Sequence, residues 1–326
     1  MNDEFRWQAP IWFRSPSAGG VFAIYARAYG LATLVRLSLP DAMAGSWLPV
    51  AFLHLLGALM VLFNGCLAGW LLCLIGSASG LLWLGDALTQ STYLLLCAIA
   101  ALGCGIAQLR GREGFLREGL PLAIRVITVG VYTSAATHKL NRGFMDPTMS
   151  CANGGLERLL RASRFAEHAE SIGSVLAIDG SAWPILYVSL VFTVAILLCL
   201  RPALGVLAAA VMHVPLTVIF APSFALVMAS GWVCFFREHE LNLLGRVMRR
   251  RWRLILPISA TAWGASQALF FVGRWKTDPD WCIKEAFVWV ALVWLVVSIV
   301  RRPADREVDS FRGRGVWLQA SPLPER

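Results

Sequence analysis

Residues 120–140, LPLAIRVITVGVYTSAATHKL, carry basic and polar side chains inside an otherwise apolar stretch. Arg125, Tyr132 and Lys139 follow one another at intervals of seven residues, which places them near one face of a helix. A lysine at a membrane boundary loses water, and this lowers its pKa toward the value that a general base needs near neutral pH. We therefore predict Lys139 as a catalytic base that His138 and Tyr132 tune. The alternative, a lysine that reaches the membrane surface as an anchor, stays equally open.

Ionisable side chains also interrupt two other apolar stretches. Arg27 and Arg36 lie in the first of them, and His213 lies in a later one. A charged group inside a membrane costs several kcal/mol unless it is paired or solvated, so each is a candidate for function. We predict that Arg27, Arg36, Arg125, Tyr132 and His213 contact a substrate, with structural bracing between helices as the alternative. Two histidines without a nearby carboxylate are too few for a metal centre, and none is predicted.

The composition places these residues in a membrane protein. Of the 326 residues, 57% are hydrophobic and 15% are charged, whereas soluble domains carry about 25% charged residues. The apolar residues form long blocks, and such blocks form helices that are apolar on every side. The chain is thus predicted to be an all-α, polytopic transmembrane helix bundle with about ten spans. The predicted spans are 21–39, 47–64, 66–84, 92–109, 120–140, 181–200, 203–220, 222–236, 253–273 and 283–300.

The distribution of basic residues predicts the orientation. If the N-terminus is cytoplasmic, most of the 29 Lys and Arg residues fall on the cytoplasmic side, as the positive-inside rule requires. The prediction is a protein of the bacterial inner membrane with both termini in the cytoplasm. Residues 1–20 form a cytoplasmic segment, 21–302 the bundle and 303–326 a cytoplasmic tail. The net charge of +9 follows from this rule, so the expected partner is the lipid bilayer and not nucleic acid.

One long connection, residues 141–180, faces outward in this topology. Leu156 and Leu160 recur at helical spacing opposite Arg158 and Arg161, which predicts a short amphipathic helix on the outer membrane surface. We favour an interfacial anchor. The alternative is a lid over an outward-facing site, with arginines that attract an anion.

Two of the eight cysteines fall on the outer side of the predicted topology. Cys151 and Cys282 both lie in outward-facing segments, where an oxidising environment permits a disulfide between them. The other six lie within or beside predicted spans and are expected to act as small hydrophobic residues.

Several short motifs together resemble a known family. An opening span with Arg-x-x-Gly is followed by a span that ends in Ala-x-His-Lys-Leu, then by an amphipathic loop helix and a late span with an internal His. The residues concerned are Arg27–Gly30, Ala136–Leu140, His213, Phe224, Met228, Phe235 and Phe236. Over roughly residues 20–240, this pattern is similar to the HTTM membrane domain of vitamin K-dependent γ-carboxylase and its bacterial relatives.

The resemblance implies a role for Lys139. It falls on the family's base lysine, which deprotonates a reduced quinone from the luminal or periplasmic side, and His138 replaces a basic residue often found before it. The implied cofactor is a quinone or hydroquinone like vitamin K. The chain departs from the family in lacking room for the carboxylase's large β-rich luminal domain. It also has no acidic residue in 181–200.

Two classes of function follow from these observations. The first is an integral-membrane enzyme that uses a reduced quinone or another isoprenoid at an outward-facing site to modify a peptide or a small lipid-soluble substrate. The second is a non-catalytic membrane protein for transport, binding or immunity, since in-span arginines without acidic partners suit the passage of an anion.

Overall fold

The computed structural model describes most of the first 251 residues. The described residues are 20–37, 48–84, 88–112, 114–146, 148–162, 166–175, 180, 182–219, 222–237, 239–243, 246–247 and 250–251. Every element in this part of the chain is helical, which confirms the predicted all-α class.

Within the described residues, eight long helices pack into a bundle, and shorter helical segments join them. The long helices are α1 (Gly20–Leu37), α3 (Leu48–Asn64), α4 (Leu67–Leu84), α5 (Leu88–Leu109), α6 (Leu120–His138), α10 (Ala182–Leu200), α11 (Pro202–Ile219) and α12 (Pro222–Trp232). The shorter ones are η2 (Phe115–Gly119), α7 (Arg142–Met145), α8 (Cys151–Ala162), η3 (Ala166–His168), α9 (Ala169–Val175) and η4 (Val233–Phe235).

The long helices follow the apolar blocks of the sequence closely. Each of the first eight predicted spans corresponds to one long helix whose ends lie within about four residues of the prediction. The last two predicted spans, 253–273 and 283–300, lie outside the described residues. Within the described part, three helices are long and apolar enough to cross a membrane: Gln90–Leu109, Phe115–His138 and Ala182–Leu200. Four more apolar helices are shorter.

The surface of the bundle is apolar, as a lipid environment requires. On α6, the side chains of Leu122 and Val126 are 61% and 64% exposed, and Phe52 on α3 is 63% exposed. Soluble proteins rarely leave large apolar patches uncovered. These exposed faces support the prediction that the helices lie in a bilayer.

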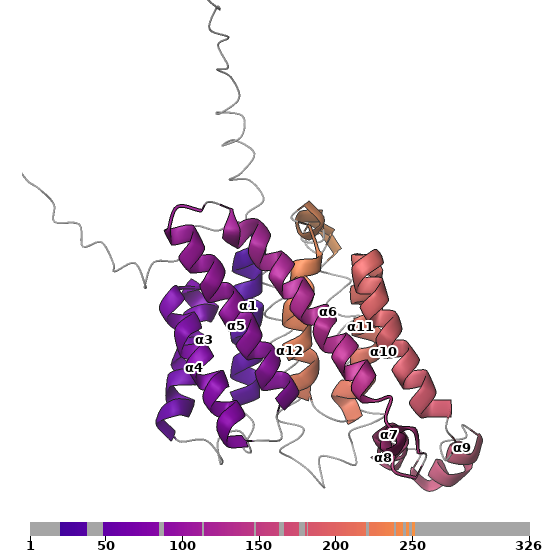
Figure 1. The fold of residues 1–326 in the computed structure, drawn as a ribbon. Helices are drawn as coiled ribbons and strands as arrows, with labels where there is room; N and C mark the ends of the chain where they lie inside the picture. Colours follow the sequence, from indigo (N-terminus) through magenta and orange to yellow (C-terminus); the bar gives the residue numbers. More distant parts are fainter. Residues whose placement is uncertain are drawn as a thin grey trace, which may run out of the picture.

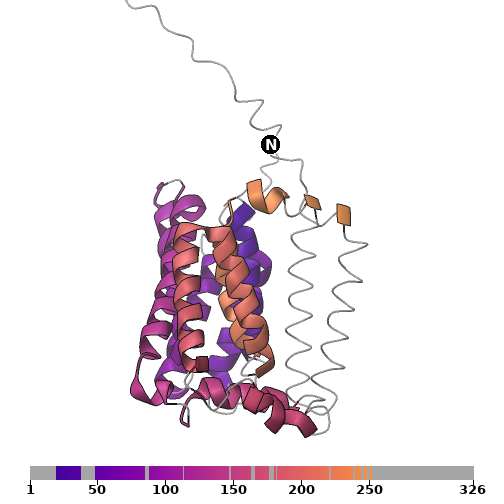
Figure 2. The ribbon, with the colours of Figure 1, turned by 90° about the vertical axis from the view of Figure 1, so that its right-hand side faces the viewer.

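The bundle has two parts that α12 and α6 join. In the first part, α3 packs against α1 and α4, and α4 packs against α5 (Figure 1). In the second, α10 packs against α6 and α11. Helix α12 contacts α1, α11 and α6, so it lies between the two parts (Figures 1 and 2). The residues that α12 presents therefore reach side chains from both halves of the sequence.

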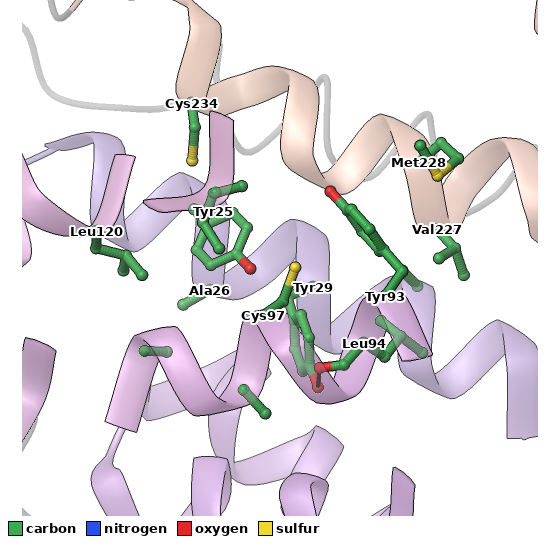
Figure 3. Close-up of a cluster of buried hydrophobic side chains, with 14 of the residues drawn as sticks. Tyr25, Ala26, Tyr29, Tyr93, Leu94, Cys97, Leu120, Val227, Met228 and Cys234 are labelled. Atoms are coloured by element: carbon green, nitrogen blue, oxygen red, sulfur yellow. Dashed lines mark hydrogen bonds between the residues drawn. The ribbon is translucent and has the colours of Figure 1, made fainter. Parts of the chain in front are cut away.

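Buried aromatic residues and cysteines fill the first part. Tyr25 and Tyr29 of α1 pack against Trp70 of α4, with ring centroids 5.9 and 4.5 Å from the Trp70 ring. Tyr93 and Cys97 of α5 lie beside them, and both are fully buried (Figure 3). The hydroxyl of Tyr29 donates to the carbonyl of Leu94 at 3.0 Å, which ties α1 to α5.

Two glycines allow close contact between helices. A Cβ at Gly30 would meet the carbonyl oxygen of Ala58 and Cα of Leu62 at 2.9 Å, so the Arg-x-x-Gly motif serves the packing of α1 on α3. A Cβ at Gly231 would collide with the Tyr93 hydroxyl and lie 2.7 Å from Oγ1 of Thr128. Gly231 therefore brings α12 against both α5 and α6.

The predicted amphipathic helix is present as α8. It packs against the ends of α10 and α11. With α7 and α9, it lies across one end of the bundle, below α6 and α10 in both views (Figures 1 and 2). On its exposed side, Arg161 pairs with Glu157 at 2.8 Å. The choice between an anchor and a lid stays a prediction.

Candidate functional site

A hydrogen-bonded aromatic group lies inside the bundle where α6, α11 and α12 meet. The hydroxyl of Tyr132 lies 2.8 Å from Nε2 of His213, and Nε1–H of Trp232 donates to the same hydroxyl at 3.3 Å. Tyr132 and His213 are 3% and 2% exposed. The Tyr132 hydroxyl thus accepts from Trp232 and shares a second hydrogen bond with Nε2 of His213, whose direction depends on the tautomer of the imidazole.

The packing of α12 explains why Trp232 reaches this position. Gly231 permits α12 to approach Thr128 of α6, and the next residue is Trp232. Its ring centroid then lies 5.5 Å from that of His213. Trp232 was not predictable as part of this group, because nothing in the amino-acid sequence shows that α12 packs between α6 and α11.

Lys139 lies at the end of the same face of α6. Seven residues of helix separate it from Tyr132, which is about 10 Å along the axis. Its ammonium nitrogen Nζ donates to the carbonyl oxygen of Ala135 at 3.3 Å. The same atom lies 5.9 Å from the ring centroid of Phe144 and 5.6 Å from that of Tyr187. The side chain thus folds back against the protein and is half-buried.

A local cap positions one of these rings. The side chain of Asn141 accepts a hydrogen bond from the backbone N–H of Phe144 at 2.8 Å and so begins the short helix α7. Its amide group donates to the carbonyl of His138, which closes the turn after α6. The turn buries Phe144 beside Lys139, with its ring 6.0 Å from that of Tyr187. Sequence reasoning missed both aromatic residues.

The surroundings of Lys139 change its acidity. The residue directly follows the candidate span Phe115–His138. Burial lowers the pKa of the Lys139 amine from its ordinary value, because an apolar environment penalises the charged form. This is the direction predicted for a base. His138 is exposed, and its side chain is not among the groups packed around the amine.

The other predicted substrate-binding residues lie elsewhere. Arg36 is 7% exposed, and its Nη1 donates to Oε1 of Gln90 at 3.3 Å. Close by, Nε2 of His54 lies 3.5 Å from Oγ of Ser77. This second polar cluster joins α1, α3, α4 and α5. Sequence reasoning passed over His54, although it and Ser77 lie in the halves of α3 and α4 nearest Arg36.

Arg125 lies toward the start of α6, far from Lys139. Its Nε donates to the carbonyl of Cys234 at 2.6 Å, and its guanidinium carbon lies 5.9 Å from the ring centroid of Phe235. The fourteen residues to Lys139 span about 21 Å of helix. Arg27 is half-buried on α1. The structure therefore brings Tyr132 and His213 together but distributes the three arginines over other regions of the bundle.

The predicted disulfide and the absence of a metal centre concern residues that are only partly described. Cys151 is exposed at the start of α8 with a free thiol. Cys282 lies outside the described residues, so the bridge stays a prediction. In the described part of the chain, no three His, Cys, Asp or Glu side chains are grouped to hold a metal ion.

Comparisons with protein-family models, curated proteins and solved structures found no match to this chain. The resemblance to HTTM domains therefore stays a prediction that rests on the motifs. The structure gives two of these motifs a local role, since Gly30 packs on α3 and Lys139 lies beside Phe144.

Proposed function

We propose that this protein is an integral-membrane enzyme in which Lys139 acts as a general base on a lipid-soluble substrate, a reduced quinone or another isoprenoid. The observation that carries the proposal is the position of the Lys139 amine. It is half-buried and lies near two aromatic rings instead of extending away from the bundle. An anchor lysine would gain most by extending into water.

The groups around the amine suit both states of a base. Burial favours the neutral amine, which is the form that accepts a proton. Once protonated, the ammonium is stabilised by the carbonyl of Ala135 and by the ring faces of Phe144 and Tyr187. In this proposal, the proton moves from a hydroxyl of the reduced ring to Nζ of Lys139. The aromatic neighbours also offer flat apolar contacts to a quinone ring.

We assign Tyr132 and His213 to orienting the substrate. They lie on the same side of α6 as Lys139 and about 10 Å deeper. Their hydrogen bond, with the second one from Trp232, holds the Tyr132 hydroxyl in one orientation. A polar substituent of a ring that lies along α6 would find a fixed donor or acceptor there.

The proposal includes the membrane topology. Ten spans with both termini in the cytoplasm, in the bacterial inner membrane, would place Lys139 and α8 on the outer side. The three candidate spans and the four shorter apolar helices support a protein that crosses the bilayer several times. The product is a modified peptide or a small lipid-soluble molecule.

The test uses purified protein in nanodiscs with chemically reduced vitamin K or menaquinone and dissolved oxygen and CO2. Consumption of the hydroquinone is followed by chromatography. Lys139→Ala should reduce the rate by about 10²–10⁴-fold, the usual contribution of a general base. Arg142→Ala, which removes a neighbouring cation from α7, is the matched control and should retain the rate. Full activity of Lys139→Ala would remove the base from the proposal, and an inactive wild type would exclude these quinones.

One observation favours the non-catalytic alternative. A cavity of about 250 Å³ near the start of α6 is lined by Arg117, Arg125 and Arg237. Arginines in a cavity suit the binding or passage of an anion. Anion flux into liposomes that survives Lys139→Ala and is lost in Arg125→Gln would support transport instead of catalysis.

A further inference from the structure

The cavity near the start of α6 combines an apolar wall with several cations. Its lining residues come from four parts of the chain: α1, η2, α6 and the segment that follows η4. They are Val21, Phe22, Arg117, Glu118, Pro121, Arg125, Phe236 and Arg237. Three of them are cations and one is an anion. Because Arg117 and Arg237 are exposed, the cavity is open to the surface.

Arg125 is held in place by two contacts. Its Nε–H is bound by the carbonyl of Cys234, and its guanidinium lies over the ring of Phe235. A guanidinium has five N–H groups. The four on its terminal nitrogens donate to no acceptor within the described part of the chain. Because this arginine is fixed through Nε, its terminal N–H groups can form a planar, bidentate pair of hydrogen bonds with an oxyanion.

The charges around Arg125 select the sign of the ligand. Arg117 and Arg237 add two exposed cations at the opening, and Glu118 offsets one of them. Guanidinium groups match the oxygens of phosphate better than a lysine does, because they bind two oxygens at once. Phe22 and Pro121 are buried and give the cavity an apolar side. Such a side suits the glycerol or acyl part of an amphiphile.

We infer that this cavity binds a phosphate-bearing anion, with Arg125 as the central ligand and Arg117 and Arg237 at the opening. The site is separate from that of Lys139, since about 21 Å of α6 lies between them. It requires no chemistry at Lys139 and therefore stands independently of the proposed enzyme. The phosphate belongs either to a lipid headgroup or to a free anion, and the experiment distinguishes the two.

The experiment measures thermal unfolding of the full chain in an uncharged detergent. The probes are inorganic phosphate, dihexanoyl phosphatidylglycerol and dihexanoyl phosphatidylcholine, with sodium chloride added to keep the ionic strength constant. A ligand that binds only the folded state stabilises it by RT ln(1 + [L]/Kd), so Tm rises with ligand concentration and the dependence reports Kd. Arg125→Gln should weaken the apparent affinity by about 10-fold or more, as expected for charged hydrogen bonds. Glu118→Gln should strengthen it.

Arg112→Gln is the matched control. Arg112 is exposed just before η2 and does not line the cavity. Its replacement removes one positive charge from the connection between α5 and α6, which also carries Arg117, but leaves the cavity unchanged. It should bind as the wild type does. If Arg125→Gln does not fold, the exposed positions provide the test through Arg117→Gln and Arg237→Gln.

Each outcome supports or overturns the site. A Tm rise with phosphatidylglycerol alone assigns a lipid headgroup, and a rise with inorganic phosphate assigns a free anion. The inference is overturned if neither probe raises Tm above the chloride control. Equal losses of apparent affinity for the probes in Arg112→Gln and Arg125→Gln would also overturn it. They would show only a general effect of net charge on anion binding.

Discussion

The hydroxyl of Tyr132 lies 2.8 Å from Nε2 of His213, although 81 residues separate the two in the sequence. Both side chains are buried, and Trp232 supplies a second hydrogen bond to the same hydroxyl. Buried polar groups are expensive when they lose a partner. This contact therefore couples α6 to α11 as well as positioning polar groups inside the bundle.

Removal of the Tyr132 hydroxyl should destabilise the protein in a way that depends on His213. Tyr132→Phe is expected to lower the free energy of unfolding by about 1–3 kcal/mol, because it deprives both His213 and Trp232 of a buried partner. A double-mutant cycle with His213→Leu should give a coupling energy of about 0.5–3 kcal/mol. Unfolding in mixed detergent micelles measures each variant.

Tyr29→Phe is the control for this cycle. It also removes a buried hydroxyl, but that hydroxyl donates to the carbonyl of Leu94 and not to His213. Its effect should add to that of His213→Leu within about 0.5 kcal/mol. Additivity of Tyr132→Phe with His213→Leu would contradict the contact.

Lys139 should titrate below an ordinary lysine. Burial penalises its charged form, so the folded protein releases this proton at a lower pH than the unfolded chain. Stability should consequently rise with pH between the folded and unfolded pKa values of Lys139, since the unfolded chain binds more protons there. Replacement by Met should remove this dependence. A base-catalysed rate would likewise increase with pH through the lowered pKa.

The pKa can be measured without an activity. The chain contains three lysines, so reductive methylation with ¹³C-formaldehyde yields few NMR signals. Lys139→Arg removes one of them and thereby assigns it. A signal that titrates at or above 10.5, the ordinary value, would show that the amine is solvated.

Gly231 should tolerate no side chain. The added methyl of Gly231→Ala would collide with the Tyr93 hydroxyl and crowd Thr128, so α12 would have to move. Overpacking of this kind costs about 1–3 kcal/mol, and it should also weaken the Trp232 contact with Tyr132. Gly130→Ala is the control, because a Cβ there meets nothing within 4 Å. The control should retain or slightly raise Tm, since alanine favours a helix.

Helix positions were predictable from the sequence because the length of an apolar block sets the length of a helix that crosses a bilayer. The pairing of helices was not, because it depends on local shape. Gly231 and Gly30 lack the Cβ that would block a neighbouring helix, and only the packed structure shows which helix approaches each of them. The spacing of Tyr132 and Lys139 correctly placed them on one face, but it gave no information about Trp232 or Tyr187 on other helices. For the same reason, three arginines predicted for one substrate occupy separate places.

The orientation can be tested at Cys151, which is exposed at the start of α8. Helix α8 lies at the end of the bundle where α6 ends, just before Lys139 (Figure 1). A variant with Cys199→Ser and Cys282→Ser leaves Cys151 as the accessible thiol, because the other described cysteines are buried. A membrane-impermeant maleimide added to spheroplasts should label it directly. In a variant that also carries Cys151→Ser and Arg112→Cys, labelling should require permeabilised membranes, since position 112 lies at the opposite end of the bundle.

The reverse pattern would overturn the predicted orientation and the outward-facing base.

The wild-type chain tests the predicted disulfide. If Cys151 and Cys282 are bonded, Cys151 should react in spheroplasts only after treatment with a membrane-impermeant reductant, because a disulfide sulfur does not alkylate. Immediate labelling of wild-type Cys151, at the rate seen in the Cys282→Ser variant, would show a free thiol. The long connection after α6 would then be held by the packing of α8 on α10 and α11, without a covalent link.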